Sequence, residues 1–381
     1  MSQLKVALFT GNYNHIRDGV SLTLNRWVSF LLDKGADVLV FGPSVENPDL
    51  DHVGELSVVP SVKMPGRPEY RITTSFPAEN KERLERFDPD IVHIASPDIL
   101  GYKALKWANK ADVPIVTSYH THFTSYLKYY SLGFFEKIGW SYLRWFYKYS
   151  EHIYVPTKSM AQELIERNIG RSPDVLKIWA RGVDTEQFNP CKRDAEWRTK
   201  MGFKEKDVVF TFVSRLVWEK NLKLFASVIK DLQAKYPHAR SMIVGEGPAR
   251  ADLESEMTDT VFTGFLTGDE LARAYASSDV FFFPSDTETF GNVTLEAMAS
   301  GLLCLVADAQ GSKSLVDHDV NGFLIPVRET DRFLKRAEEL VNRDELRKKM
   351  GEKSVEKAQN YTWEKINSKL LDHYRDVIEN A

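Results

Sequence analysis

Short apolar runs alternate with longer amphipathic stretches along the whole chain. In the first half, the runs with the length and composition of buried strands are Lys5–Thr10, Ala36–Phe41, Ile91–Ile94, Ile115–Ser118 and His152–Val155. Stretches between them, such as Ser21–Lys34 and Ala78–Phe87, have the period of a surface helix. Strands that alternate with helices predict right-handed crossovers and a doubly wound parallel sheet.

The alternation then restarts. Its second set of predicted strands is Val208–Val213, Ala239–Val244, Thr260–Phe262, Val280–Phe283 and Leu303–Ala307. Between the two sets, Ile178–Pro190 has no strong period and is predicted to link two domains. We therefore predict an α/β protein with two Rossmann-like domains, residues 1–185 and 186–362, that face each other across a cleft. Periodicity does not decide whether the last helix, Trp363–Ile378, caps the second domain or returns to the first.

Composition narrows the class of protein. The 381 residues are 43% hydrophobic and 27% charged, as in soluble globular proteins of two domains. A net charge of −4 argues against extensive nucleic-acid binding. Two cysteines, Cys191 and Cys304, suit a reducing compartment. The chain has neither a secretory signal pattern nor an apolar run of the roughly 18 residues that span a bilayer, so we expect a cytoplasmic protein, at most attached to the inner membrane surface.

Two loops of the first half follow predicted strands. Gly11 ends the first strand, and the loop through Gly19 leads into a helix whose N-terminus could bind an anion; the alternative is a tight turn. His120 and His122 follow the strand that ends at Ser118. We assign His120 to the binding of a sugar or an acceptor and His122 to structure, because no third ligand nearby supports a metal site.

Cationic and glycine-rich loops follow the first strands of the second half. Arg215 and Lys220 lie five residues apart after Val208–Val213, where fixed cations could hold the negative charge of a leaving diphosphate. The alternative is a solvated basic pair at the start of a helix. The turn Gly245-Glu246-Gly247-Pro248 ends the next strand, and a phosphate loop and a simple turn remain equally open for it.

The strongest motif runs from Asp286 to Gly301. A strand ending at Phe283 leads into a polar loop with Glu288, and a helix is predicted to begin near Gly291. Backbone N–H groups at that helix start could hold a phosphate. Glu296 lies about one and a half turns into the helix, so the two carboxylates could reach a sugar and a ribose.

With these motifs together, the sequence resembles the family 4 retaining glycosyltransferases of the GT-B fold over nearly its whole length. The resemblance rests on Glu288-x7-Glu296, Arg215 with Lys220, Gly245-Glu246-Gly247-Pro248 and Arg181-Gly182-Val183-Asp184. It implies a C-terminal donor domain, an N-terminal acceptor domain, and a last helix, 363–378, that packs back on the N-terminal domain. The implied catalytic residues are His120, Arg215, Lys220 and Glu288. The implied donor-binding residues are Gly19, Arg215, Lys220, Gly264, Phe265, Glu288, Thr289, Phe290, Gly291, Asn292 and Glu296.

Within that family, Ser118–Phe123 and Trp179–Pro190 are most similar to two subgroups. They are the GDP-mannose-dependent α-mannosyltransferases of membrane glycolipids and the sulfoquinovosyl- or glucuronosyl-diacylglycerol synthases. The implied donor is therefore GDP-mannose, a UDP-hexose or a UDP-uronic acid, and the implied acceptor is a lipid or glycolipid. Asp308–Ser312 departs from the usual Gly-Gly loop, so the donor stays open. No Asp-x-Asp motif follows a strand, and we expect no cofactor and no required metal. An epimerase of the same fold and a non-catalytic sugar-nucleotide binder are the alternatives.

Aromatic and basic residues are interleaved over residues 123–149. Such a mixture suits the headgroup layer of an anionic membrane. The alternative is a helix that packs one face in the domain core and leaves its lysines in water. Both interpretations stay open for part of the stretch.

Overall fold

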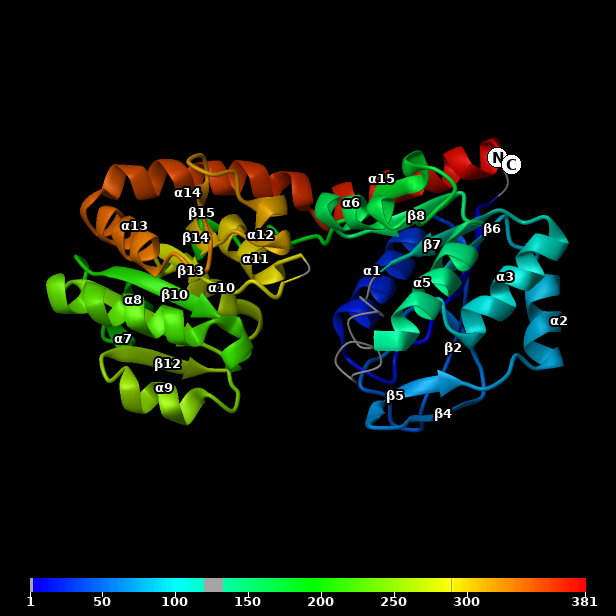
Figure 1. Cartoon of the computed structure of the whole chain (residues 1–381), viewed down its shortest axis with the longest axis horizontal. Helices are drawn as coiled ribbons and strands as arrows, with labels where there is room; N and C mark the ends of the chain where they lie inside the picture. Colours follow the sequence, from blue (N-terminus) through cyan, green and yellow to red (C-terminus); the bar gives the residue numbers. More distant parts are fainter. Residues whose placement is uncertain (1–2, 120–132, 289) are drawn as a thin grey trace. The chain divides into compact units, whose positions relative to one another are not determined.

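The computed structural model describes residues 3–119, 133–288 and 290–381, which form two compact units (Figure 1). The first unit contains Met1–Trp179 and Asn367–Ala381, and the second contains Ala180–Ile366. The sequence placed the division at residues 185 and 186, a few residues later. The C-terminal segment from Asn367 belongs to the first unit. No helix among the described residues combines the length and apolar character needed to cross a bilayer.

A seven-stranded sheet forms the centre of the first unit, in the order β3-β2-β1-β6-β7-β8-β9. All its neighbouring strands are parallel. The strands are β1 (Lys5–Phe9), β2 (Asp37–Gly42), β3 (Glu55–Val58), β6 (Ile91–Ile94), β7 (Ile115–Ser118), β8 (His152–Val155) and β9 (Leu176–Ile178). A separate antiparallel hairpin consists of β4 (Ser61–Met64) and β5 (Arg67–Thr73). The predicted strands of this half are found within two residues of their expected bounds, whereas β3, β9 and the hairpin were not predicted.

Helices flank this sheet. They are α1 (Gly19–Asp33), α2 (Ala78–Phe87), α3 (Ile99–Ala111), α5 (Gly133–Tyr147), α6 (Lys158–Glu166), the 3-10 turn η1 (Pro173–Val175) and α15 (Trp363–Glu379). Helix α1 begins where the Asp18 carboxylate accepts hydrogen bonds from the backbone N–H groups of Val20 and Ser21. In α15, Leu370, Leu371, Tyr374 and Val377 are buried. The helix packs against the first unit through a ring contact between Tyr374 and Trp27.

The second unit has a six-stranded sheet in the order β12-β11-β10-β13-β14-β15. Its strands are β10 (Val208–Val213), β11 (Ala239–Val244), β12 (Thr260–Gly264), β13 (Val280–Phe283), β14 (Leu303–Ala307) and β15 (Gly322–Ile325), all parallel. Its helices are η2 (Pro190–Lys192), α7 (Ala195–Lys200), η3 (Trp218–Lys220), α8 (Leu222–Lys235), α9 (Arg250–Glu256), α10 (Gly268–Ala276), α11 (Asn292–Ala299), α12 (Gln310–Leu315), α13 (Thr330–Asn342), α14 (Asp344–Ala358) and η4 (Gln359–Tyr361).

Both sheets have the doubly wound order in which the second and third strands lie on one side of the first and the later strands on the other. Strand β10 is fully buried and flanked by β11 and β13, which explains its continuous apolar run Val-Val-Phe-Thr-Phe-Val. In such sheets the order of successive strands reverses beside the first strand, and ligands bind outside the carboxyl ends of the strands there. The switch points lie between β1 and β6 in one unit and between β10 and β13 in the other.

Candidate donor site at the second switch point

The candidate residues of the second unit come from the two strands that flank its switch point. Arg215 and Lys220 follow β10, and Glu288 follows β13, its neighbour in the sheet. Because both strands are parallel, their carboxyl ends meet at one edge. The topology thus explains why residues 68 positions apart in sequence are in contact.

Lys220 and Glu288 form an ion pair. The Lys220 ammonium donates to Glu288 Oε1 at 2.6 Å and to Thr287 Oγ1 at 3.0 Å. The side chains are only 14% and 22% exposed, so water screens the pair less than it screens a surface pair. Arg215 differs: its side chain is 75% exposed, and it lies 3.8 Å from Glu219. Of the two predicted cations, Lys220 is held in place and Arg215 extends into solvent.

Asn221 fixes the loop that carries Lys220. Its backbone is left-handed, with a φ of 56°, which asparagine tolerates better than most residues. Its side-chain amide donates to Pro284 O at 2.9 Å and to Asp286 Oδ1 at 3.0 Å. The loops after β10 and β13 are therefore tied together by a residue that the motif analysis did not single out.

The Gly245–Gly247 turn supports the same loop from the other side. A Cβ on Gly245 would lie 1.9 Å from Ser214 O, and one on Gly247 would lie 2.4 Å from Leu216 O. Leu216 N donates to Glu246 O at 2.8 Å. These glycines allow close backbone contact beside Arg215, which accounts for them without a bound phosphate.

The start of α11 has the features expected of an anion site. Gly291 caps it with a left-handed φ of 94° and has no side chain to bond the first N–H groups of the helix. Asn292, the first residue of α11, is exposed. Phe290 is buried and its ring centroid lies 6.2 Å from that of Tyr361. Only the backbone of Phe290 is therefore in a position to contact a ligand.

Glu296 lies on the partly buried side of α11. Tyr275 of α10 donates its hydroxyl to Glu296 Oε2 at 3.1 Å. Burial, and then the charge of Glu296, raise the pKa of Tyr275 well above its usual value, so Tyr275 stays a donor. This contact was not predicted, and Tyr275 has no sequence signal beyond its place in an amphipathic helix.

The turn after β12 exposes an aromatic side chain. Gly264 has a left-handed φ of 76°, and Phe265, the next residue, is 74% exposed. A Cβ on Gly264 would lie 2.9 Å from Glu246 Oε1, which places this turn beside the Gly245–Gly247 turn. An exposed ring of this size next to the strand ends suits stacking on a nucleotide base.

Gly311, in the segment that departs from the family pattern, is the second residue of α12 and contacts the Glu288 loop. Gly311 N donates to Glu288 O at 3.1 Å, and a Cβ on Gly311 would lie 2.9 Å from both Glu288 O and Glu288 Cβ. The unusual sequence Asp308–Ser312 marked this segment, but its contact with Glu288 could not be predicted from sequence.

At the first switch point, Gly19 is the first residue of α1 and is exposed. The Asp18 carboxylate already binds the N–H groups of Val20 and Ser21, so an anion here would compete with it. Gly11 N donates to Ser96 Oγ at 3.2 Å, which joins the loops after β1 and β6. The predicted residues His120 and Thr289 lie outside the described residues.

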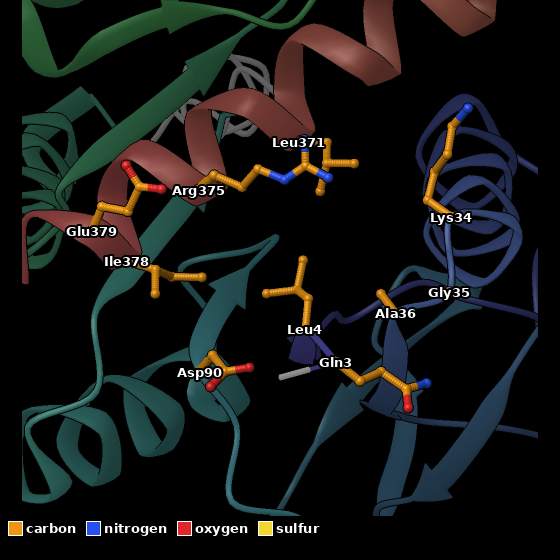
Figure 2. A pocket seen from close by; sticks show the side chains of 10 residues that line it. All are labelled: Gln3, Leu4, Lys34, Gly35, Ala36, Asp90, Leu371, Arg375, Ile378 and Glu379. Atoms are coloured by element: carbon orange, nitrogen blue, oxygen red, sulfur yellow. The ribbon is translucent and has the colours of Figure 1, made fainter. Parts of the chain in front are cut away.

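Two open pockets of the first unit lie at the opposite edge of its sheet, where the strands begin. In Figure 2, Leu371, Arg375 and Ile378 of α15 lie across a pocket of about 400 Å³ from Leu4 and Ala36. A second pocket of about 440 Å³ lies between the starts of β8 and β9 and α15. Neither contains a predicted site residue.

The described aromatic rings of the 123–149 stretch belong to the core. Trp140, Phe146 and Tyr147 are at most 5% exposed. Tyr142, Trp145 and Tyr149 are partly buried and pack against the same core. The surface of α5 instead presents Lys137, Ile138, Ser141 and Arg144, with Lys148 just after the helix. These buried rings are therefore not exposed to a membrane, whereas the basic face of α5 is exposed. Residues 123–132 of the stretch lie outside the described residues, and the membrane interpretation stays a prediction.

Within residues 3–119, 133–288 and 290–381, no three His, Cys, Asp or Glu side chains are grouped so as to hold a metal ion. The expectation that no metal is required is not tested by this observation and stays a prediction.

Comparisons with known proteins show the family of the chain. The model of the family described as Glycosyltransferase Family 4 matches residues 17–187, and that described as Glycosyl transferases group 1 matches residues 193–357. A sulfoquinovosyl transferase of Arabidopsis thaliana is 37% identical over 75% of this chain, and the aligned region spans 56% of that relative. A GDP-mannose-dependent alpha-mannosyltransferase of Mycobacterium tuberculosis is 32% identical over 99% of this chain and 98% of its own length.

Solved structures share the fold. A sucrose-phosphate synthase from Thermosynechococcus elongatus superposes with a TM-score of 0.75 at 16% identity over 100% of both chains. A glycosyltransferase from Rickettsia africae gives a TM-score of 0.72, also at 16% identity over 100% of both chains. The predicted GT-B fold is confirmed. With two family models that cover most of the chain and a mycobacterial relative that aligns along nearly its full length, this protein belongs to the family 4 glycosyltransferases.

Proposed function

We propose that the chain transfers a hexosyl group from a nucleotide-diphosphate sugar to a hydroxyl group of a lipid or glycolipid, with retention of the anomeric configuration. The observation that carries this proposal is the Lys220–Glu288 pair at the second switch point. A cation and a carboxylate held side by side match the two parts of the donor, its diphosphate and its sugar hydroxyls. The epimerase and the non-catalytic binder are not favoured by the family match.

In the proposed reaction, negative charge develops on the diphosphate as the glycosidic bond breaks. Lys220, Arg215 and the start of α11 would stabilise that charge, as preorganised cations and N–H dipoles do in other transfer reactions. Glu288 is engaged with Lys220, and we assign it to binding the sugar rather than to covalent attack. The leaving phosphate would then take the proton of the acceptor hydroxyl on the same face of the sugar.

One relative, a glycosyldiacylglycerol synthase, directs the acceptor assignment to lipids, and a second is named for a GDP-mannose donor. An alpha-monoglucosyldiacylglycerol synthase of Streptococcus pneumoniae is 24% identical over 78% of this chain, and the GDP-mannose-dependent alpha-mannosyltransferase of Corynebacterium glutamicum is 30% identical over 98%. A lipid acceptor requires the enzyme to work at a membrane surface. We propose that Lys137, Arg144 and Lys148, on the exposed side of α5, contact anionic headgroups, with Ile138 inserted among them.

The donor part is tested by thermal-shift titration of the purified protein with GDP, UDP, ADP and their sugar conjugates. A ligand that binds only the folded state raises its melting temperature. We expect one nucleotide to raise the melting temperature more than the others. Lys220→Met should lose most of that increase, while Lys223→Met, at the second residue of α8, should keep it. Equal shifts of the melting temperature in the two variants would contradict the donor assignment. So would the absence of a shift with every nucleotide tested.

The membrane part is tested by flotation with vesicles that contain phosphatidylglycerol. We expect binding that falls in the double variant Lys137→Glu/Lys148→Glu and is unchanged in Lys349→Glu, an exposed lysine of α14. Equal flotation of both variants, or none by the parent protein, would rule out the α5 surface and leave the donor assignment intact.

A further inference from the structure

Four buried side chains of the first unit form a continuous chain of hydrogen bonds. Trp27 Nε1 of α1 donates to the Tyr374 hydroxyl of α15 at 3.1 Å. That hydroxyl lies 2.5 Å from Nδ1 of His93 in β6, and His93 Nε2 lies 2.5 Å from the Ser118 hydroxyl at the end of β7. All four residues are at most 1% exposed. They therefore connect α1, the C-terminal helix and two central strands without access to water.

The direction of this chain follows from its first member. The indole N–H of Trp27 can only donate, so the Tyr374 oxygen accepts from it. The Tyr374 hydrogen then needs an acceptor of its own, and among the described residues His93 Nδ1 is the one within hydrogen-bond distance. His93 Nδ1 is therefore unprotonated. The neutral imidazole consequently has its proton on Nε2 and donates it to Ser118 Oγ. Burial supports the neutral form, since it lowers the pKa of His93 to about 3.

We propose that Tyr374 is a positioning residue for the carboxyl end of β7 at Ser118, which lies two residues before His120 in the sequence. It acts by fixing the tautomer of His93, whose Nε2–H then holds the Ser118 hydroxyl. The Ser118 carbonyl is held from the other side by the Tyr147 hydroxyl at 3.3 Å. This inference rests on the proposed function for the role of His120, but the hydrogen-bond chain itself does not.

Tyr154 provides a matched control. It belongs to β8, its ring stacks on that of Tyr374 at 6.2 Å, and it is 1% exposed. Its hydroxyl, however, is buried and has no hydrogen-bond partner among the described residues. Tyr374→Phe and Tyr154→Phe thus remove the same atom from the same aromatic cluster, and only the first interrupts the chain.

We expect Tyr374→Phe to lower kcat about tenfold and to leave the KM for the donor within twofold of the parent value. A small displacement of a reacting group lowers the rate of the chemical step more than it lowers the affinity for the substrate. Tyr154→Phe should change neither. Hydrogen exchange of a peptide that covers 115–122 should increase in Tyr374→Phe alone. If Tyr374→Phe lowers only the melting temperature, with kcat and the exchange of that peptide like those of Tyr154→Phe, the residue is merely structural and the proposal is overturned.

Nitrogen NMR of histidine-labelled protein tests the direction of the chain independently of any activity. We expect His93 to be protonated on Nε2, and this preference to weaken in Trp27→Phe, which lacks the indole donor. Protonation of His93 on Nδ1 in the parent protein would overturn the proposal. If the parent protein transfers no sugar while the Nε2 tautomer and the exchange difference are both found, the proposed function fails and the positioning of the strand end stands.

Discussion

His93 should make the first unit sensitive to acid, and His93→Gln should reduce that sensitivity. The pKa of His93 is lowered by burial from 6.5 to about 3. As the pH falls below 6.5, the unfolded chain binds a proton that the folded unit does not, so stability is present above pH 6.5 and decreases toward pH 3. Gln does not titrate, and its amide can still bond to both neighbours of His93.

The size of the effect follows from the two pKa values. At pH 5 the unfolded imidazole is almost fully protonated and the folded one is neutral, which lowers the free energy of unfolding by about 2 kcal/mol relative to pH 7.5. The full difference, reached near pH 3, is about 5 kcal/mol. Burial also lowers the pKa of His152, to about 4, and that of His373. These two residues reduce stability at acid pH equally in the parent protein and in the variant, so they do not affect the comparison.

Urea unfolding is measured at pH 7.5 and pH 5 and monitored by the hydrogen exchange of a β6 peptide. This peptide reports the stability of the first unit separately from that of the second. The parent protein should lose about 2 kcal/mol more than His93→Gln between these pH values. His238→Gln, in the second unit, should retain the dependence of the parent. If His93→Gln and the parent lose stability equally, His93 is not the buried neutral group that we describe.

Three further predictions concern the transfer reaction. Gly19→Ala places a Cβ where no atom lies within 4 Å, so the melting temperature should be unchanged. The kcat/KM should nevertheless fall about tenfold, because the added methyl group meets the ligand, and unchanged activity would remove Gly19 from the site. Gly311→Ala forces a Cβ to within 2.9 Å of the backbone oxygen of Glu288, so we expect kcat to fall about tenfold and the melting temperature to fall as well. Gly202→Ala, which is strained by its positive φ of 85°, is the control that lowers the melting temperature without touching Glu288. Transfer should proceed in EDTA at the untreated rate, and loss of activity that manganese restores would contradict metal independence.

The sequence was sufficient for the main elements of the fold because buried parallel strands have continuous apolar runs. Strand β10, fully buried, was predicted within its bounds. Strand β3 was missed because it lies at the edge of the sheet and its four residues, Glu-Leu-Ser-Val, contain no continuous apolar run. The β4–β5 hairpin was missed because its residues are mostly exposed and polar, with no apolar run to mark them.

The candidate site was predicted only as far as strand ends can be predicted. Lys220 and Glu288 were placed at one sheet edge by topology, and their contact follows from it. The contacts of Asn221 with Pro284, of Tyr275 with Glu296 and of Gly311 with Glu288 were not predicted. Such contacts depend on the backbone geometry of separate segments rather than on spacing within one motif. The aromatic residues of α5 could not be assigned from sequence for a related reason: a helix with rings on one side has the same composition whether that side meets lipid or core.

The ion pair between Lys220 and Glu288 also bears on selectivity between substrate and product. On the proposed assignment, any phosphate that takes Lys220 away from Glu288 leaves a partly buried carboxylate without its cation, which is costly. An intact sugar nucleotide can compensate, since its sugar hydroxyls donate to the released carboxylate. A nucleotide diphosphate without the sugar cannot, and inorganic phosphate cannot either. The ion pair would therefore lower the affinity of the site for the nucleotide diphosphate that is left after transfer. It would also lower the affinity for inorganic anions of the cell.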